Sequence, residues 1–157
     1  MLTCYDMMQC RSVHIPFSPG TKLTPNIERF SDPSVTSCYQ QIIGSLMYAM
    51  LSSRPDICFT VNHLSQFGSN LTEDHLLAAQ HVLYYLSTMQ SHKITYSQND
   101  FTEIVGYSDS DWATDTDGHR STTSYVFILS GGSIAWAMQK QQMVTLHMIA
   151  SNTIFHK

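Results

Sequence analysis

The stretch that decides the fold is Gly106-Tyr107-Ser108-Asp109-Ser110-Asp111-Trp112-Ala113, in which a β-rich run ends in two carboxylates. Arg120-Ser121-Thr122 and further β-rich runs up to Trp136 follow it. A carboxylate at the exit of a strand is where enzymes that cleave phosphodiesters hold metal ions, but this chemistry needs several carboxylates that converge on two metals. No Asp or Glu follows Asp117 in the sequence. The stretch therefore points to a nuclease metal site and also predicts that this site is incomplete.

Strand-like runs lie on both sides of this stretch. Short segments rich in β-branched and aromatic residues are found at 93–96, 103–107, 125–129 and 133–136. Gly131-Gly132 has the composition of a tight hairpin turn between the last two. We therefore expect residues 103–136 to form a three-stranded antiparallel meander. Residues 144–155 are apolar, and their periodicity leaves strand and helix open.

The preceding segment, residues 37–91, is predicted to be helical, with helices that begin near Ser37, Pro55 and Thr72. Proline suits the first turn of a helix because its missing N–H costs no hydrogen bond there, and threonine is a good N-cap. Apolar residues recur at helical spacing in each of the three helices. Their apolar faces consist of Ile42, Ile43, Leu46, Met47, Met50 and Leu51, of Ile57, Val61 and Leu64, and of His75, Ala79, Val82, Leu83 and Leu86.

Residues 1–36 differ from the rest because they hold most of the prolines, Pro16, Pro19, Pro25 and Pro33. So much proline is incompatible with a continuous helix or a central strand, and it predicts an extended arm. Residues 10–17 can still form one edge strand. An arm, a helical segment and a segment of strands together predict the α+β class.

The composition excludes several classes of function. The chain has 8 Lys plus Arg against 12 Asp plus Glu, and its net charge is -4. Because nucleic-acid affinity comes largely from cations that neutralise phosphates, we expect weak nucleic-acid binding. The four cysteines form no CxxC pair, so zinc is not expected. Without a signal-peptide pattern or a bilayer-spanning apolar run, we expect a soluble intracellular protein with no membrane contact, in either cytoplasm or nucleus.

Two interpretations fit a group of four aspartates, Asp109, Asp111, Asp115 and Asp117. They form either a metal-binding cluster or a solvated loop in which aspartates cap turns, and spacing alone favours the loop. An EF-hand calcium site is excluded because Ala113 and Ser124 occupy the positions of two essential ligands. Asp111 is expected to direct its side chain away from that of Asp109.

Histidines and tyrosines are also candidate functional residues. His63, His75, His81 and His119 lack the spacing of a helical metal-binding pair, and His75 lies in an apolar face, so structural roles are expected. Tyr84, Tyr85 and Tyr107 have rings that can stack on nucleic-acid bases. Their positions within periodic elements favour core packing instead.

The order and spacing of the longer motifs resemble those of a known family, the Pol polyprotein of Ty1/copia-type retrotransposons. The segment that follows the polymerase palm in this family is similar to Tyr39-Gln40-Gln41-Ile42-Ile43-Gly44-Ser45-Leu46-Met47-Tyr48, Ser53-Arg54-Pro55-Asp56-Ile57 and Asn70-Leu71-Thr72-Glu73-Asp74-His75. The start of the family's ribonuclease H domain resembles the stretch 106–113, Arg120-Ser121-Thr122 and Gly131-Gly132-Ser133-Ile134-Ala135-Trp136. The resemblance extends over residues 10–146.

The resemblance implies roles for individual residues. Asp109 matches the first metal-binding Asp of the ribonuclease H site, and Ala150 falls where the family has its metal-binding Glu. Arg120, Ser121 and Thr122 match a family block and are candidate contacts to nucleic acid. The intact family copies RNA into DNA and degrades the RNA of an RNA–DNA hybrid with two magnesium ions. We expect this chain to do neither and to hold no cofactor, with Asp109 a weak metal ligand at best.

The sequence thus predicts an inactive, truncated remnant of Pol: an arm (1–36), a thumb- or connection-like end of reverse transcriptase (37–91) and a truncated ribonuclease H-like domain (92–157). Two alternatives remain open, a small non-catalytic protein-interaction module and a weak residual nucleic-acid binder. The helices that normally cover such a sheet are mostly absent. We therefore expect apolar residues of the sheet to be exposed, or covered by a protein partner, namely Ile104, Tyr107, Val126, Ile128 and Trp136.

Overall fold

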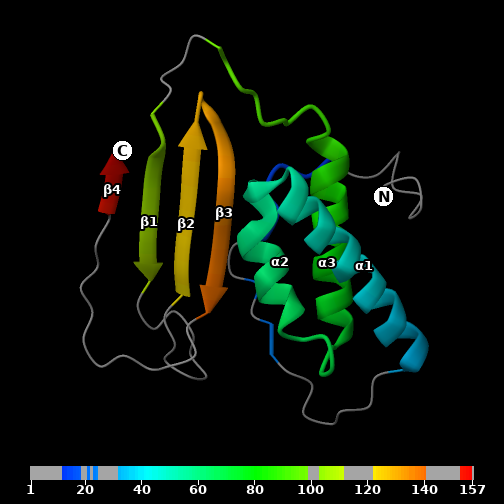
Figure 1. Ribbon diagram of the computed structural model, residues 1–157. Helices are drawn as coiled ribbons and strands as arrows, with labels where there is room; N and C mark the ends of the chain where they lie inside the picture. Colours follow the sequence, from blue (N-terminus) through cyan, green and yellow to red (C-terminus); the bar gives the residue numbers. More distant parts are fainter. Residues whose placement is uncertain are drawn as a thin grey trace, which may run out of the picture. The chain divides into compact units, whose positions relative to one another are not determined.

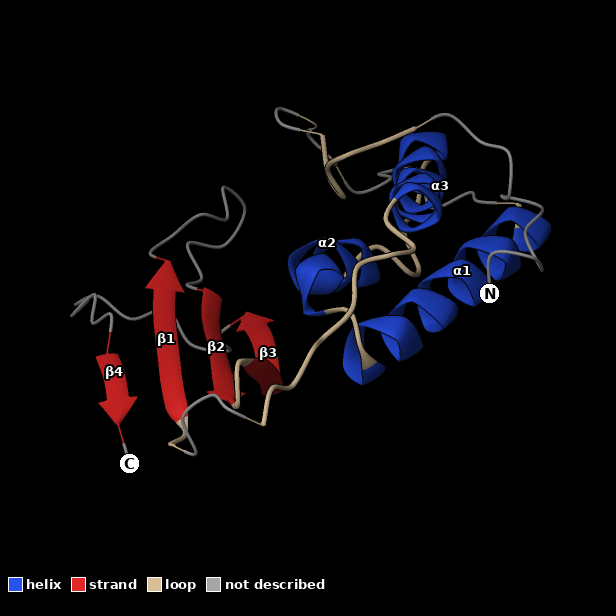
Figure 2. Cartoon of the chain, turned by 90° about the horizontal axis from the view of Figure 1, so that it is seen from above, coloured by secondary structure: helices blue, strands red, loops and turns tan. Residues whose placement is uncertain are grey.

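The computed structural model describes residues 12–18, 21, 23–24, 32–98, 103–111, 122–140 and 153–156. The chain divides into two compact units, Met1–Lys93 and Ile94–Lys157. The first unit holds the helices and the second holds the strands (Figure 1), which confirms the predicted α+β class. Figure 2 shows the same separation by colour, with helices in blue and strands in red.

Helix α1 (Pro33–Ser52) begins earlier than predicted. Asp32 is its N-cap, and its carboxylate accepts the backbone N–H of Ser34 at 2.9 Å and the Ser34 hydroxyl at 2.8 Å. These two hydrogen bonds lower the pKa of Asp32. The predicted start near Ser37 was wrong, and residues 33–36 belong to the helix rather than to the arm. Pro33 begins the helix because the first turn leaves its N–H position unpaired in any case.

The inner face of α1 packs against the other helices of the first unit. Its buried residues are Tyr39, Ile42, Ile43, Leu46 and Met50. The Tyr39 hydroxyl donates to the carbonyl of Leu64 at 2.7 Å, and burial raises the pKa of this phenol. Met47 and Leu51 were predicted on the same face, but they are 37% and 68% exposed. The apolar residues of α1 thus extend beyond the arc that the neighbouring helices cover.

Two further helical segments complete the first unit. Pro55–Ile57 forms one 3₁₀ turn (η2) that leads into α2 (Cys58–Ser65), and α3 spans Glu73–Thr88. Thr72 is the N-cap of α3, as predicted. The apolar faces predicted for these two helices are all buried: Ile57, Val61 and Leu64 in the earlier one, and His75, Ala79, Val82, Leu83 and Leu86 in the later one.

The second unit is a four-stranded sheet in the order β3-β2-β1-β4, and every neighbouring pair is antiparallel. Its strands are β1 (Val105–Asp111), β2 (Thr122–Leu129), β3 (Gly132–Lys140) and β4 (Thr153–His156). The predicted meander is confirmed as β1-β2-β3. Strand β4 pairs with the other edge of β1, so this part of the apolar C-terminal run is a strand. Residues 144–152 lie outside the described residues.

Residues 93–96 were predicted as a strand but form none. The ring of Tyr96 lies against the β2–β3 hairpin, and its hydroxyl donates to the carbonyl of Ser133 at 2.8 Å. The backbone N–H of Ser97 donates to the carbonyl of Ser130 at 2.9 Å. Contacts to the hairpin thus take the place of a strand ladder. The described part of residues 10–17 likewise contains no strand.

The turn between β2 and β3 consists of Ser130 and Gly131, whereas Gly131 and Gly132 were predicted. Both turn residues have positive φ, 51° and 78°, as a two-residue type I′ hairpin requires. Gly132 is the first residue of β3. A Cβ at this position would lie 2.5 Å from the Tyr96 ring and 2.9 Å from the Thr95 carbonyl oxygen. The glycine is therefore required for close packing rather than for the turn.

Apolar side chains of the sheet are exposed, in part as predicted. Ile104 and Tyr107 are 43% and 46% exposed, while Val126, Ile128 and Trp136 are half-buried. Tyr125 and Ile134, which were not in the predicted set, are each 42% exposed. Gly106 and Gly132 are the buried residues among those of the second unit whose side-chain exposure is described. The described part of the sheet therefore has no buried apolar core of its own.

We expect Gly132→Ala to destabilise the sheet by about 1–3 kcal/mol, because the added methyl group meets a backbone carbonyl as well as a ring. Gly44→Ala is the matched control, since a Cβ there has nothing within 4 Å. This exposed, mid-helix change should stabilise α1 by up to about 1 kcal/mol. Urea unfolding measures both variants. Tryptophan fluorescence follows the second unit, where both tryptophans lie, and far-UV circular dichroism follows the helices. A wild-type urea midpoint for Gly132→Ala would contradict the close packing.

Candidate functional site

Asp109, the residue that matches a metal-binding Asp, lies in β1 and is exposed. Its register partner in β2 is Ser124, which in turn pairs with Met138 of β3. Paired residues of antiparallel strands share one face of the sheet. The residues beside Asp109 in the neighbouring strands thus carry a hydroxyl (Ser124) and a thioether (Met138). No described register partner supplies a second carboxylate.

The other predicted site residues are only partly described. Asp111 is the last residue of β1, but its side chain lies outside what the structure describes, so the expectation for Asp111 stays a prediction. Thr122 is the first residue of β2 and pairs with Asp111 on one side and with Lys140 on the other. Ala150, Arg120, Ser121, Asp115, Asp117 and His119 lie outside the described residues.

The described residues around Asp109 supply few of the ligands that a metal site needs. Magnesium requires near-octahedral oxygen coordination, and two-metal cleavage requires several carboxylates at once. Within the described ranges, no group of three or more His, Cys, Asp or Glu side chains is placed to hold a metal ion.

The three described candidate histidines have structural contacts in the first unit. His75 is fully buried, and its Nδ1 accepts the backbone N–H of Thr72 at 2.9 Å. The His63 ring stacks on Phe59, with the two planes 8° apart and the centroids 6.0 Å apart. His81 Nε2 donates to the carbonyl of Ile15 at 3.0 Å. These contacts agree with the structural roles expected from the sequence.

Tyr85 belongs to a polar cluster that the sequence did not predict. Arg54 binds Asp56 through both Nε and Nη2, the latter 2.7 Å from Oδ2, and Nη1 donates to the carbonyl of Met89 at 3.2 Å. The Tyr85 hydroxyl donates to Asp56 Oδ2 at 2.8 Å, and its ring lies under the guanidinium at 5.6 Å. The cluster ties the start of η2 to the end of α3. Arg54-Pro55-Asp56 was visible as a motif, but its partner Tyr85 lies too far along the chain to be found from spacing.

Burial alone would raise the pKa of Asp56, but the hydrogen bonds from Arg54 and Tyr85 lower it overall. The pKa of Arg54 is raised by its hydrogen bond to Asp56, and the pKa of Tyr85 is raised by burial and by the same carboxylate. All three groups thus keep their ordinary charges at neutral pH. A cluster of this kind stabilises the fold and supplies no acid or base for chemistry at neutral pH.

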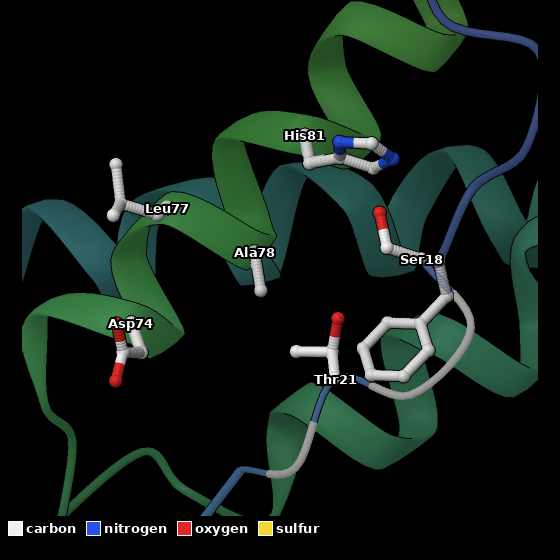
Figure 3. Close-up of a pocket in the computed structure, with 7 residues that line it drawn as sticks. Ser18, Thr21, Asp74, Leu77, Ala78 and His81 are labelled. Carbon is white, nitrogen blue, oxygen red and sulfur yellow. The ribbon is translucent and has the colours of Figure 1, made fainter.

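A cleft of about 410 Å³ lies between the N-terminal segment and the first turns of α3. Its walls comprise Phe17, Ser18, Thr21, Asp74, Leu77, Ala78 and His81. Figure 3 shows the side chains of Ala78 and Thr21 turned toward the same space. The walls mix hydroxyls and one carboxylate with apolar surface, and nothing in the sequence predicted this cleft.

Comparison with known proteins places these elements in a family. Over 145 residues the chain is 36% identical to the retrovirus-related Pol polyprotein from transposon RE1 of Arabidopsis thaliana, a match that covers 92% of this chain and 10% of that protein. It is 32% identical over 150 residues to the Pol polyprotein from transposon TNT 1-94 of Nicotiana tabacum, covering 93% of this chain and 11% of that protein. The chain belongs to the copia-type retrotransposon Pol family.

The chain spans about a tenth of the length of these Pol polyproteins. A different kind of relative is the secreted RxLR effector protein 161 of Plasmopara viticola, which is 40% identical over 108 residues, 69% of this chain and 76% of that protein. No protein-family model matches the chain, and no solved structure matches it. No helix among the described residues is long and apolar enough to cross a membrane.

We expect Asp56→Asn to lower the free energy of unfolding at pH 7 by on the order of 1–3 kcal/mol, since it weakens charge-assisted hydrogen bonds to Arg54. The folded pKa of Asp56 is depressed, so its stabilisation is complete above the unfolded pKa of about 3.9 and is lost as pH falls through the folded pKa. The variant should therefore lose less stability on acidification below pH ~4. Urea titrations across pH measure this difference. Tyr85→Phe is the control that removes one hydrogen bond and keeps the ion pair, and an unchanged acid response in Asp56→Asn would contradict the assignment.

Proposed function

We propose that this chain is a non-catalytic piece of a copia-type Pol protein, which joins the helical end of the reverse transcriptase to the first strands of its ribonuclease H domain. The observation that carries this proposal is that the described register partners of Asp109 include no second carboxylate: they are Ser124 and, one strand further, Met138. The family resemblance also aligns Ala150 with the metal-binding Glu. The polymerase motif is also missing from this sequence, which contains no Asp-Asp pair.

A single exposed carboxylate is a poor substitute for a two-metal site. It binds a hydrated magnesium ion weakly and fixes the position of neither ion against a phosphodiester. Arg120, Ser121 and Thr122 remain the candidate contacts to an RNA–DNA hybrid. With a net charge of -4, the chain neutralises few phosphates, so binding through this block is expected to be weak and strongly salt-dependent.

The chain should cleave no RNA in an RNA–DNA hybrid, with either magnesium or manganese, because no second carboxylate holds the metals. Gel analysis of a labelled hybrid measures this, with Asp109→Asn as the matched variant. Ala150→Glu should not restore cleavage, because it adds one ligand where several are needed. Metal-dependent cleavage that Asp109→Asn abolishes would refute the proposal, and would mean that other carboxylates complete the site.

A second candidate function, a protein-interaction module, is favoured by the outer face of α1. Tyr48 and Leu51 are 78% and 68% exposed, Met47 is 37% exposed, and a Cβ at Gly44, one turn before Tyr48, would have nothing within 4 Å. Exposed apolar patches of this kind on a soluble protein commonly mark interaction sites. The Plasmopara relative supports this candidate, because a related segment makes up 76% of that protein rather than a tenth of a polyprotein.

The partner we propose for this face is another part of a copia-type Pol. Tyr48→Lys with Leu51→Lys should weaken binding to a separately expressed copia-type polymerase segment on the order of tenfold or more, because both residues lie at the centre of the proposed contact. Leu77→Lys is the control, since Leu77 is a leucine of similar exposure, 55%, on another helix. Calorimetric titration measures the affinities. Equal affinities of the double variant and the wild type would contradict a protein-interaction role for this face.

A further inference from the structure

The start of α3 is capped by a histidine in place of a carboxylate. His75 is the third residue of the helix, and Thr72 is its N-cap. The Thr72 backbone N–H donates to His75 Nδ1 at 2.9 Å, and the Thr72 hydroxyl lies 2.7 Å from the same nitrogen. In a capping box this acceptor is normally a Glu or Gln side chain. A ring nitrogen that accepts a backbone N–H carries no proton, so the imidazole is neutral and holds its proton on Nε2.

The surroundings of His75 disfavour a charge. The residue is 0% exposed, and its Nε2 has no hydrogen-bond partner among the residues that the structure describes. Phe67 covers it at a centroid distance of 4.2 Å. Burial lowers the pKa of His75. The charged and titratable groups that face it are Asp74 on its own helix, which opposes this shift, and His63 of α2, which reinforces it.

Protonation of His75 therefore has a defined structural consequence. A proton on Nδ1 turns the acceptor of the cap into a donor, and this donor faces the N–H and the hydroxyl of Thr72. It also places a cation in a buried site at the positive end of a helix dipole. Both effects are relieved when the first turn of α3 opens and the ring reaches water.

A continuous row of rings connects this cap to the N-terminal segment. Phe67 contacts His63 at 5.6 Å, and His63 contacts Phe17 at 5.6 Å, both edge to face. Residues 12–18 are also held on α3 by two hydrogen bonds, from the Val13 N–H to Thr88 Oγ1 at 2.9 Å and from His81 Nε2 to the Ile15 carbonyl at 3.0 Å. Loss of the Phe67 contact removes the support on one side of His63 and hence of Phe17.

We propose that His75 is an acid-operated latch, whose protonation opens the first turn of α3 and loosens residues 12–18 from α2 and α3. The latch acts by local opening, well before the helices of the first unit separate. It uses His75 alone as the titrating group. His81 Nε2 donates to the carbonyl of Ile15 and takes no part in the cap.

Hydrogen exchange of the full chain between pH 7.5 and 5.5, corrected for intrinsic exchange rates, tests the latch. Protection of the amides of residues 72–76, and with it that of residues 13–18, should fall by up to about tenfold per pH unit in the wild type, the limit for a single proton. His75→Gln keeps the acceptor without a titratable group and should abolish the pH dependence, whereas His81→Gln should retain it. An equal fall in His75→Gln, or opening of 72–76 with residues 13–18 unaffected, would overturn the proposal.

A second measurement needs no variant. Nitrogen-15 chemical shifts of the imidazole in the wild-type chain report its tautomer and its titration. We expect the Nε2–H tautomer at neutral pH and a titration midpoint for His75 below the ordinary value of a histidine. An Nδ1–H tautomer, or a midpoint at the ordinary value of about 6.5, would refute the latch even if His75→Gln fails to fold.

Discussion

The close packing of α1, α2 and α3 is the interaction on which the rest of the described structure depends. Every apolar residue found buried lies in this helical unit, from Tyr39 of α1 to Leu86 of α3. Burial of this kind is the dominant favourable term in folding, at about 25 cal/mol per Å² of apolar surface removed from water. The polar contacts are placed around it: Tyr39 bonds to Leu64, Asp56 joins Arg54 to Tyr85, and His75 caps α3 beneath Phe67.

The sheet has no equivalent source of stability in its described residues. Its strands are paired throughout, with a shift of register between Phe127 and Ile128, but the described apolar side chains of the sheet are half-buried or exposed. Instead, two glycines allow aromatic rings to pack closely against the strands. Gly106 lets the ring of Phe127 lie over β1, and Gly132 lets Tyr96 lie against the hairpin. Such contacts fix geometry while burying little apolar area, so a sheet of this kind gains from any surface that covers it.

Local patterns in the sequence predicted which helices and strands form better than they predicted the residues at which these elements begin and end. The helical spacing of the apolar residues correctly predicted the buried faces of α2 and α3. The Gly131-Gly132 pair predicted the position of the hairpin turn to within one residue. The misses have specific causes. Pro33 was taken as a breaker although proline also fits the first turn, and Met47 and Leu51 were assigned to the core because periodicity cannot tell how wide an arc the neighbours cover. Residues 93–96 are β-rich, but they contact a hairpin through Tyr96 instead of joining the ladder.

The candidate site was predictable only where it is local in sequence. Asp109 and the motif around it were identified from the sequence, whereas Ala150 lies outside the described residues and its alignment with the family's Glu stays a prediction. The Arg54–Asp56–Tyr85 cluster and the histidine cap were missed for different reasons. The cluster needs a partner from the far end of α3, and the cap uses an imidazole where the familiar pattern has a carboxylate, so His75 was recognised as a core residue but not as the cap.

The outer face of α1 and the described end of the sheet differ in their charged residues, and therefore in the kind of partner they can bind. Helix α1 contains no acidic or basic residue from Pro33 to Ser52, so its outer face offers apolar contact without cations for phosphates. The described end of the sheet carries Asp109 and Asp111 beside Lys140 in the register, and this gives it little net attraction for a polyanion. Nucleic-acid affinity depends on the number of phosphates neutralised, whereas protein interfaces depend on desolvated apolar anchors such as tyrosine. On these grounds a helix face without charged residues, on which Tyr48 is exposed, suits a protein partner better than nucleic acid.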